Sequence, residues 1–397
     1  VGPQLVPDRR QLESVRDRIR ARGLYGRVSA IHWDETYLPY TANTVTLLVL
    51  SQEYGNVPRG EVDRVLSPSG LAYVEEDGKL HRHGKNWPDG LDQWTHARHD
   101  STGNAVSQDR RVGQPRHMQW YASPRFTRAS KISGMVTAKG RVFAILNDAQ
   151  IGSVDSTWAL VARDAFNGIR LWRHELPSWR GGRGGKKTGP VQTDRKLVTD
   201  GDRVYAPLRE FGPVSVLDAA TGRVLKTVPE TEHAEEMVLS DGVLVVLINT
   251  DTPADIRRGL ETPKRFVAYD IEDGQLLWQH RSGRVMPTTL AADDRQVVYH
   301  DGTRVQSLEL RTGRERWRSP PTGQSVEYRD RAGPDRPGAE ESTVIIAPQF
   351  GPTLVIYEDV VACAGGRQVN VLDAEDGQEL WQGEYGPSSY SMPVDLF

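Results

Sequence analysis

The sequence contains a single cysteine, Cys363, among its 397 residues. One thiol excludes an intrachain disulfide, and it also excludes zinc sites built from several cysteines. The residues around it, VVACAGG, are small and apolar. We therefore expect Cys363 to be a buried core residue rather than a nucleophile.

Long apolar runs and an excess of one charge are missing as well. No stretch reaches the run of about 18 apolar residues that predicts a membrane-spanning helix. The 50 Lys and Arg residues are balanced by 53 Asp and Glu residues, and this net charge of −3 argues against a nucleic-acid-binding protein. The first residues, VGPQ, are neither an initiator methionine nor a signal peptide, so we expect any targeting segment to be missing or already removed.

Glycine, proline and tryptophan are abundant, with 38, 24 and 10 residues, as is typical of short strands joined by tight turns. One frame, D-x3-G-x3-W, recurs five times. Asp is kept in four copies, Trp in four and Gly in all five; the copies are Asp164–Trp172, Asp218–Lys226, Asp270–Trp278, Glu309–Trp317 and Asp373–Trp381. Successive glycines are 54, 52, 39 and 64 residues apart, which indicates a repeated unit with loop insertions of different length.

The chemistry of this frame predicts a β-hairpin. An apolar strand such as Val214–Leu217 leads into the Asp, whose carboxylate can accept hydrogen bonds from the backbone of the turn. The glycine supplies the positive φ that closes the turn, and the second strand ends in a Trp that can wedge between neighbouring sheets. Further strand signals lie between the hairpins, so each copy has material for about four strands. A single copy would be ordinary hairpin chemistry, but five copies predict a mainly β fold, a β-propeller with four-stranded blades over residues 116–397.

The repeat, with LDAATG and LDAEDG after apolar strands, resembles the PQQ-like repeat family. This family includes PQQ-dependent alcohol dehydrogenases and the lipoprotein propellers of outer-membrane assembly. The dehydrogenases of this family hold a calcium ion near the quinone, use an Asp as a base and carry a disulfide between adjacent cysteines. The resemblance implies that redox chemistry in this chain would need the same three features. With one cysteine that disulfide cannot form, and no counterpart of the calcium cluster is found, so we do not expect PQQ as a cofactor.

Residues 1–80 show a different pattern of apolar residues. Leu12, Val15 and Ile19 are spaced as on one face of a helix that ends at Gly23, and apolar strand candidates follow at 27–33, 44–50 and 71–76. Nearly continuous apolar strands of this kind are typical of a parallel sheet that is buried on both faces. We therefore expect a partial α/β, Rossmann-like domain.

The order of these elements resembles the second half of a class I SAM-dependent methyltransferase. The resemblance rests on Asp34 before Leu38-Pro39-Tyr40 and on Arg64-VLSPSG. It implies that Asp34 lies beside the adenine of SAM. The glycine-rich loop of that family would precede Val1, and Asp8 is displaced from the position of the ribose-binding acid, so SAM is expected to bind only in a longer chain.

Residues 81–115 are predicted to be a linker and the opening of the propeller. Its WTHARHDSTGN stretch leaves three interpretations open. His96, His99 and Asp100, with Trp94, Asn104 and Asp109 nearby in sequence, are candidates for a metal or ligand site. Alternatively, Asp100 begins an Asx turn at the start of the first blade, or the whole stretch is a solvated linker.

Two further segments stand out by composition. The first, 180–189, alternates glycine with Arg and Lys and is either a solvated loop or an anion-binding loop. The second, 329–342, is expected to be an insertion between strands. The last residues, 391–397, look like the beginning of another strand, so we expect the propeller to be incomplete at the C-terminus.

Three functions remain open at this point. The first is a non-redox scaffold that binds a protein, glycan or small molecule on the propeller face. The second is a SAM-dependent methyltransferase whose propeller presents the substrate, and the third is a PQQ-dependent oxidoreductase. The resemblance favours an extracytoplasmic location, and the sequence assigns no catalytic residue.

Overall fold

A computed structural model describes residues 2–54, 56–114, 118–122, 132–147, 157–177, 179, 193–250, 263–323, 352–365 and 367–385. The chain divides into two compact units. The first comprises Val1–Asp89 with Arg116–Trp120, and the second comprises Gly90–Pro115 with Tyr121–Phe397. Most of the predicted linker therefore belongs to the second unit.

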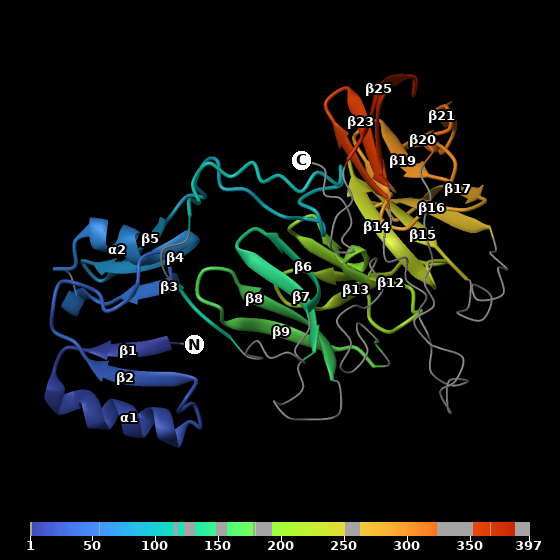
Figure 1. Ribbon diagram of the computed structural model, residues 1–397. Helices are drawn as coiled ribbons and strands as arrows, with labels where there is room; N and C mark the ends of the chain where they lie inside the picture. Colours follow the sequence, from blue (N-terminus) through green and yellow to red (C-terminus); the bar gives the residue numbers. More distant parts are fainter. Residues whose placement is uncertain are drawn as a thin grey trace, which may run out of the picture. The chain divides into compact units, whose positions relative to one another are not determined.

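The described part of the second unit contains five four-stranded antiparallel sheets, each with its strands in chain order (Figure 1). Blade 1 consists of β6 (Ile132–Ala138), β7 (Arg141–Asn147), β8 (Trp158–Asp164) and β9 (Arg170–Glu175). Blade 2 consists of β10 (Val198–Thr199), β11 (Arg203–Pro207), β12 (Val214–Asp218) and β13 (Val224–Thr227). Blade 3 consists of β14 (Ala234–Ser240), β15 (Val243–Ile248), β16 (Lys264–Asp270) and β17 (Leu276–Ser282).

Blade 4 consists of β18 (Ala291–Ala292), β19 (Gln296–His300), β20 (Val305–Glu309) and β21 (Glu315–Arg318). Blade 5 consists of β22 (Thr353–Tyr357), β23 (Val360–Gly365), β24 (Gln368–Asp373) and β25 (Glu379–Glu384). The first strands of successive blades, which we call the inner strands, contact one another in the order β6, β10, β14, β18, β22. Four-stranded meanders whose inner strands are neighbours form the blades of a β-propeller. The mainly β prediction is therefore confirmed.

Each copy of the repeated frame forms the predicted hairpin between the third and fourth strands of a blade. The glycine N–H donates to the main-chain oxygen of the frame's first residue at 2.8–3.0 Å, and the glycines have φ between 68° and 78°. In the four copies that begin with Asp, the carboxylate accepts two further turn N–H groups, as Asp218 does from Ala220 and Thr221. The turn chemistry read from the sequence is confirmed.

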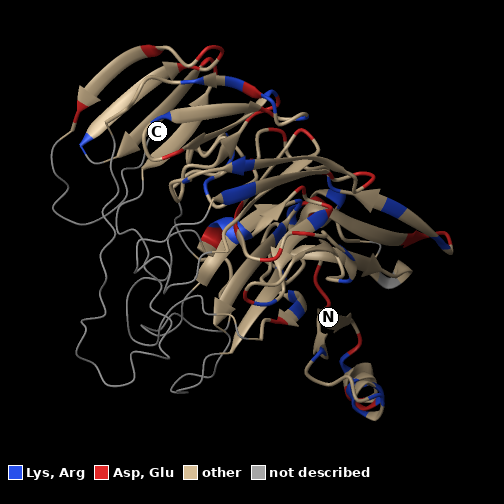
Figure 2. Cartoon of the chain, turned by 90° about the vertical axis from the view of Figure 1, so that its right-hand side faces the viewer, with Lys and Arg blue, Asp and Glu red and all other residues tan. Residues whose placement is uncertain are grey.

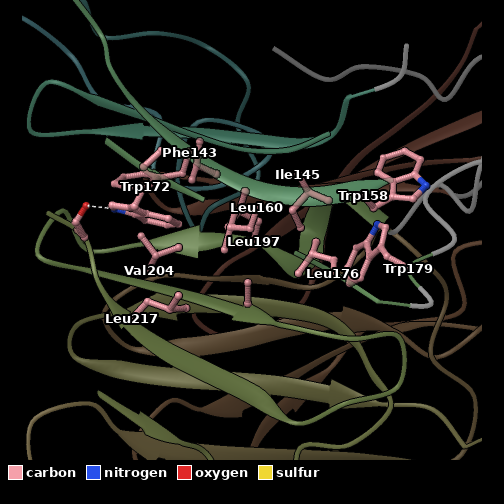
Figure 3. Packing of buried hydrophobic residues seen from close by; sticks show 14 residues of the cluster. Phe143, Ile145, Trp158, Leu160, Trp172, Leu176, Trp179, Leu197, Val204 and Leu217 are labelled. Atoms are coloured by element: carbon pink, nitrogen blue, oxygen red, sulfur yellow. Dashed lines mark hydrogen bonds between the residues drawn. The ribbon is translucent and has the colours of Figure 1, made fainter. Parts of the chain in front are cut away.

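The frame tryptophans join neighbouring blades. Trp172 lies in a core shared by blades 1 and 2, beside Phe143, and its indole N–H donates to Ala219 O of blade 2 at 3.0 Å (Figure 3). The ring also covers Gly222, where a Cβ would come within 2.6 Å of it. Trp278 and Trp317 make the corresponding bonds to the following blades, and all three tryptophans are buried. The predicted wedge is confirmed for these three.

The first unit is an α/β arrangement. Strand β1 (Gly2–Val6) pairs in parallel with β2 (Val28–His32), and helix α1 (Leu12–Ala21) connects them after a short 3-10 turn, η1 (Arg9–Gln11). Strand β3 (Val45–Leu50) pairs in parallel with β4 (Leu66–Glu76), which pairs antiparallel with β5 (Lys79–Gly84). A second short turn, η2 (Gln52–Tyr54), and helix α2 (Arg59–Val65) connect β3 to β4.

Charged residues of both signs are interspersed along the chain (Figure 2).

The prediction that the strands of this unit are buried on both faces is wrong for β3. Leu48 and Leu50 pack in a cluster with Val62 and Val65 of α2. Leu47 and Val49, on the opposite face, are 59% and 63% exposed. Among the described residues only one face of β3 has a helix against it, so the other face lies open.

Two further observations concern the sequence predictions. Cys363 is fully buried in a cluster between blades 4 and 5, as expected. In the described part of the chain, no helix is long and apolar enough to cross a membrane.

Candidate functional site at the propeller axis

The stretch that connects the two units lies against the inner strands of the propeller. Residues 92–104, here called the axial segment, receive one main-chain N–H from the inner strand of every described blade. The bonds are Thr137 N to Trp94 O (2.6 Å), Thr199 N to Thr95 O (3.0 Å), Leu239 N to His96 Nε2 (2.9 Å), Ala292 N to Ser101 O (2.8 Å) and Ile356 N to Thr102 O (2.9 Å). One short segment therefore ties together five sheets that are distant in sequence.

A tight turn in the axial segment allows it to contact the inner strands of all the described blades. His96 N donates to His99 O at 3.1 Å, and His99 has a positive φ of 66°. Asp100 then forms the predicted Asx turn, with its Oδ1 accepting from Thr102 N at 2.9 Å. Gly103 follows with φ +76°, and a Cβ there would lie 2.8 Å from Leu354 O of blade 5. The turn is part of the axial segment rather than the opening of blade 1.

His96 is buried and uses both ring nitrogens. Its Nε2 accepts the Leu239 N–H, so its Nδ1 carries the proton and donates to Thr95 Oγ1 at 2.8 Å. Burial lowers the pKa of His96 to about 3, and the nearby charges of Arg195 and His99 act in the same direction. The imidazole is therefore neutral at physiological pH, and both nitrogens are engaged within the fold.

His99 is buried between two carboxylates. Its Nε2 lies 2.8 Å from Asp92 Oδ2, and its Nδ1 lies 3.3 Å from Asp100 Oδ2. Burial raises the pKa of Asp92, but backbone hydrogen bonds from Gln93 and Gln108, the Ser107 hydroxyl and the charge of His99 together leave that pKa below its ordinary value. An ionised Asp92 orients the ring of His99 and holds the turn of the axial segment in place.

This geometry bears on the three interpretations of the stretch. A solvated linker is wrong, since His96 and His99 are each only 6% exposed. Within the described ranges, no group of three or more His, Cys, Asp or Glu side chains is arranged to hold a metal ion. The metal site at His96, His99 and Asp100 stays a prediction, and the hydrogen bonds give these side chains a structural role.

A buried ion pair lies beside the axial segment. Arg195, in the short turn η3 (Thr193–Lys196) before β10, approaches Glu236 of β14 at 3.4 Å and donates to Leu290 O at 2.9 Å. Glu236 also accepts Thr288 N at 2.5 Å. Burial raises the pKa of Glu236, and Arg195 opposes this rise. The pair connects blades 2, 3 and 4.

Further charged groups surround this pair. Lys264 Nζ lies 2.6 Å from Glu235 Oε2 and donates to Val285 O. Burial raises the pKa of Asp194 and lowers that of Lys196. Perturbed groups of this kind gather at functional sites, although structural ion-pair networks produce the same shifts.

A small pocket separates the ion pair from the axial segment. It is lined by Ala97, Arg98, Asp100, Ser101 and Gly103 of the segment and by Arg195, Val198, Met237, Val238 and Leu290 of the blades. Its volume of about 10 Å³ is close to the minimum that holds one water molecule. Arg195 lines this pocket, and among the residues that the structure describes its Nη2 is buried without a hydrogen-bond partner.

The other predicted site residue, Asp34, lies in the first unit. It is exposed just after β2, and its carboxylate is 3.8 Å from His32 Nε2. The Leu38-Pro39-Tyr40 segment is held on helix α2, because Arg64 donates to Leu38 O and Tyr40 O while Glu61 accepts Leu38 N. Cofactor binding at Asp34 stays a prediction. The predicted loops 180–189 and 329–342 lie outside the described residues.

Comparison with known proteins identifies the repeat. The family described as outer membrane protein assembly factor BamB matches residues 159–336 and 265–394, which together span more than half of the chain. The chain belongs to this family. The resemblance to PQQ-like repeat proteins is confirmed, whereas the match does not include the first unit and gives no support to a methyltransferase domain.

Solved structures with similar arrangements have low overall likeness. BamB from Moraxella catarrhalis is 11% identical with a TM-score of 0.38, covering 67% of this chain and 77% of that one. Quinohemoprotein alcohol dehydrogenase from Comamonas testosteroni is 13% identical with a TM-score of 0.45, covering 77% of this chain and 52% of that one. A europium-containing methanol dehydrogenase is 12% identical with a TM-score of 0.40, covering 77% and 61%. No curated protein matches the sequence.

Proposed function

We propose that this BamB-family chain is a non-redox scaffold that binds a partner protein on the outside of its propeller. The observation that carries the proposal is the axial segment, which accepts one main-chain N–H from the inner strand of each of the five described blades. Ligand pockets of enzymes commonly enclose about 300–1,000 Å³. In the described part of the chain, the pocket beside the axial segment has room for about one water molecule, and we therefore place recognition on the blade surfaces.

The outer strands of the blades offer suitable surfaces. Strands β13 and β17 are sheet edges, and Val224, Leu225, Leu276 and Leu277 are between 37% and 42% exposed. An extended peptide can add to such an edge through main-chain hydrogen bonds, with apolar side chains giving specificity. Strand β21, at the same place in blade 4, is charged on both sides of Trp317, and charges of this kind protect an edge from pairing.

Photo-crosslinking in the native host tests this use of β17. A photoreactive residue at Leu277 should crosslink to one partner protein, whereas the same residue at Arg316, the equivalent position on β21, should give at least about tenfold less product. The products are measured by immunoblotting and mass spectrometry. Equal labelling at both positions would contradict recognition at this edge.

Activity assays separate the scaffold from a quinoprotein. Adding PQQ and Ca²⁺ to the purified chain should give no dye-linked dehydrogenase signal and no rise in Tm. A ligand-dependent Tm increase together with substrate oxidation would favour the oxidoreductase and overturn the non-redox proposal.

We place this scaffold outside the cytoplasm. The proposal is supported by the family description, which names a factor of outer-membrane assembly. The partner is a protein rather than a nucleic acid, since the net charge of −3 offers no basic excess.

For the first unit we propose the second half of a class I methyltransferase-like fold. Its support is the order of two parallel strand pairs with a helix in each connection, and the position of Asp34 two residues after the end of β2. Calorimetric titration with SAM should give no heat with this chain and measurable heat with a chain extended before Val1. In the extended chain, Asp34→Ala should weaken SAM binding by about tenfold. If neither the present chain nor the extended chain gives binding heat with SAM, the proposal is wrong.

A further inference from the structure

The pocket beside the axial segment is small and has charged residues in its wall. Its volume of about 10 Å³ limits an occupant to about the size of one water molecule. A chloride or bromide ion takes up a similar space, whereas phosphate, sulfate and carboxylate groups are larger. The size of the pocket therefore selects a monoatomic ion or a water molecule.

Arg195 provides a buried hydrogen-bond donor at this pocket. The residue is 8% exposed and lines the pocket. Its Nη1 serves both Glu236 Oε2 at 3.4 Å and Leu290 O at 2.9 Å. Within the described residues, its Nη2 is buried and has no hydrogen-bond partner. A buried donor on a charged group forms its strongest hydrogen bond with an acceptor of opposite charge.

The charges of the lining residues favour an anion over a water molecule. The lining includes two arginines, Arg98 and Arg195, and one acid, Asp100. Both oxygens of Asp100 are engaged within the turn of the axial segment, because Oδ1 accepts from Thr102 N at 2.9 Å and Oδ2 lies 3.3 Å from His99 Nδ1. The lining residues therefore carry a surplus of positive charge.

The acids around Arg195 compensate its charge only in part. Burial raises the pKa of both Glu236 and Asp194, so it favours the neutral forms of these carboxyl groups. The positive charge of Arg195 also acts on His96, whose pKa it helps to lower. A buried guanidinium whose charge is only partly balanced attracts an anion.

Apolar side chains complete the blade side of the pocket. They are Val198, Met237, Val238 and Leu290, and each is at most 4% exposed. Such a wall lowers the local dielectric constant and strengthens the attraction between a guanidinium and an anion.

We propose that this pocket is a binding site for a chloride ion, which accepts a hydrogen bond from Arg195 Nη2 and contacts the turn of the axial segment. The bound ion joins the axial segment to Arg195, whose other contacts are with Glu236 of β14 and with Leu290 before β18. It thereby stabilises the contact between the axial segment and blades 2 to 4. The site does not depend on the partner surface proposed above, which lies on the outer strands.

Thermal unfolding in two salts tests the proposal. Replacing about 0.2 M sodium gluconate with the same concentration of sodium chloride should raise the Tm of the propeller by about 3 °C. The ionic strength is equal in both salts, so charge screening cancels in the comparison. The rise should saturate with chloride concentration, as binding to a single site does.

Two variants connect this effect to the pocket. Arg195→Lys keeps a positive charge beside Glu236 and removes Nη2, while Val198→Ile fills the pocket and leaves every charge in place. In both variants the difference in Tm between the two salts should fall below about 1 °C. Val216→Ile is the matched control, since Val216 and Val198 are both 1% exposed in the same apolar cluster and Val216 does not line the pocket. This control should keep the full chloride effect.

Bromide located by anomalous scattering in crystals of the chain identifies the position of the ion. A peak within hydrogen-bond distance of Arg195 Nη2, absent from Val198→Ile, supports the proposal. Equal Tm values in chloride and gluconate overturn it and make water the occupant. A chloride effect that persists in Val198→Ile, or bromide found only at other positions, also overturns it. If Arg195→Lys does not fold, Val198→Ile and its control still decide between these outcomes.

Discussion

Replacing Trp278 with alanine is expected to lower the free energy of unfolding of the propeller by about 4 kcal/mol. The side chain is 6% exposed, packs between blades 3 and 4, and donates its indole N–H to Leu310 O. Alanine would leave a cavity between blades 3 and 4, and Leu310 O would lose its hydrogen-bond donor. Urea unfolding, followed by the β-sheet signal in circular dichroism, measures the change.

Trp381→Ala is the matched control, because it changes the same residue of the same frame. Trp381 is 55% exposed, so this substitution in the present chain should cost less than about 1 kcal/mol. A loss at Trp278 no larger than that at Trp381 would mean that the frame tryptophans do not hold neighbouring blades together.

The local chemistry of the blades could be predicted because it is contained in nine consecutive residues. In Asp270–Trp278 the carboxylate, the glycine and the tryptophan each act within the hairpin or on the next blade. The frame therefore predicts the turn, the strand direction and one interblade contact. It does not say how many blades are present, since Trp381 has the same sequence signal as Trp278 and a different environment.

The axial segment could not be predicted, for a physical reason. Its partners, from Thr137 to Ile356, are spread over more than two hundred residues, and nothing local marks Thr199 or Ala292 as a donor to it. The polar composition of residues 81–115 favoured a linker. In the fold, four main-chain carbonyls of the segment and the ring of His96 accept N–H groups of the inner strands that would otherwise be buried unpaired.

Two strands of the first unit were also missed. Strand β1, GPQLV, contains glycine and proline, which are rare inside strands. Strand β5, KLHRHG, is exposed throughout and has no apolar alternation, so its pairing with β4 leaves no pattern in the sequence. Both segments are strands because they pair with a neighbouring strand, and their own residues do not predict one.

Lowering the pH from about 7.5 to about 5 should destabilise the propeller by about 4 kcal/mol through two buried histidines. Burial lowers the pKa of His96 to about 3 and that of His300 to about 4. The unfolded chain binds these protons near the ordinary histidine pKa of 6.5, so between the folded and unfolded pKa values it holds more protons than the folded chain. Each histidine's contribution is thus fully present above the unfolded pKa and is lost as the pH falls toward the folded pKa, by about 2 kcal/mol at pH 5.

Two variants separate this effect from that of the carboxylates. His96→Gln keeps an acceptor near Leu239 N, and His300→Asn keeps one near Gly302 N, which His300 Nδ1 now accepts. Each variant should lose only about 2 kcal/mol over the same pH range, although both should be less stable than the parent at pH 7.5. Asp194 and Glu236, whose pKa values burial raises, are present in all three chains, so their contribution cancels in the comparison. A parent chain whose pH dependence matches that of the His96→Gln variant would show that His96 is not held neutral at the axis.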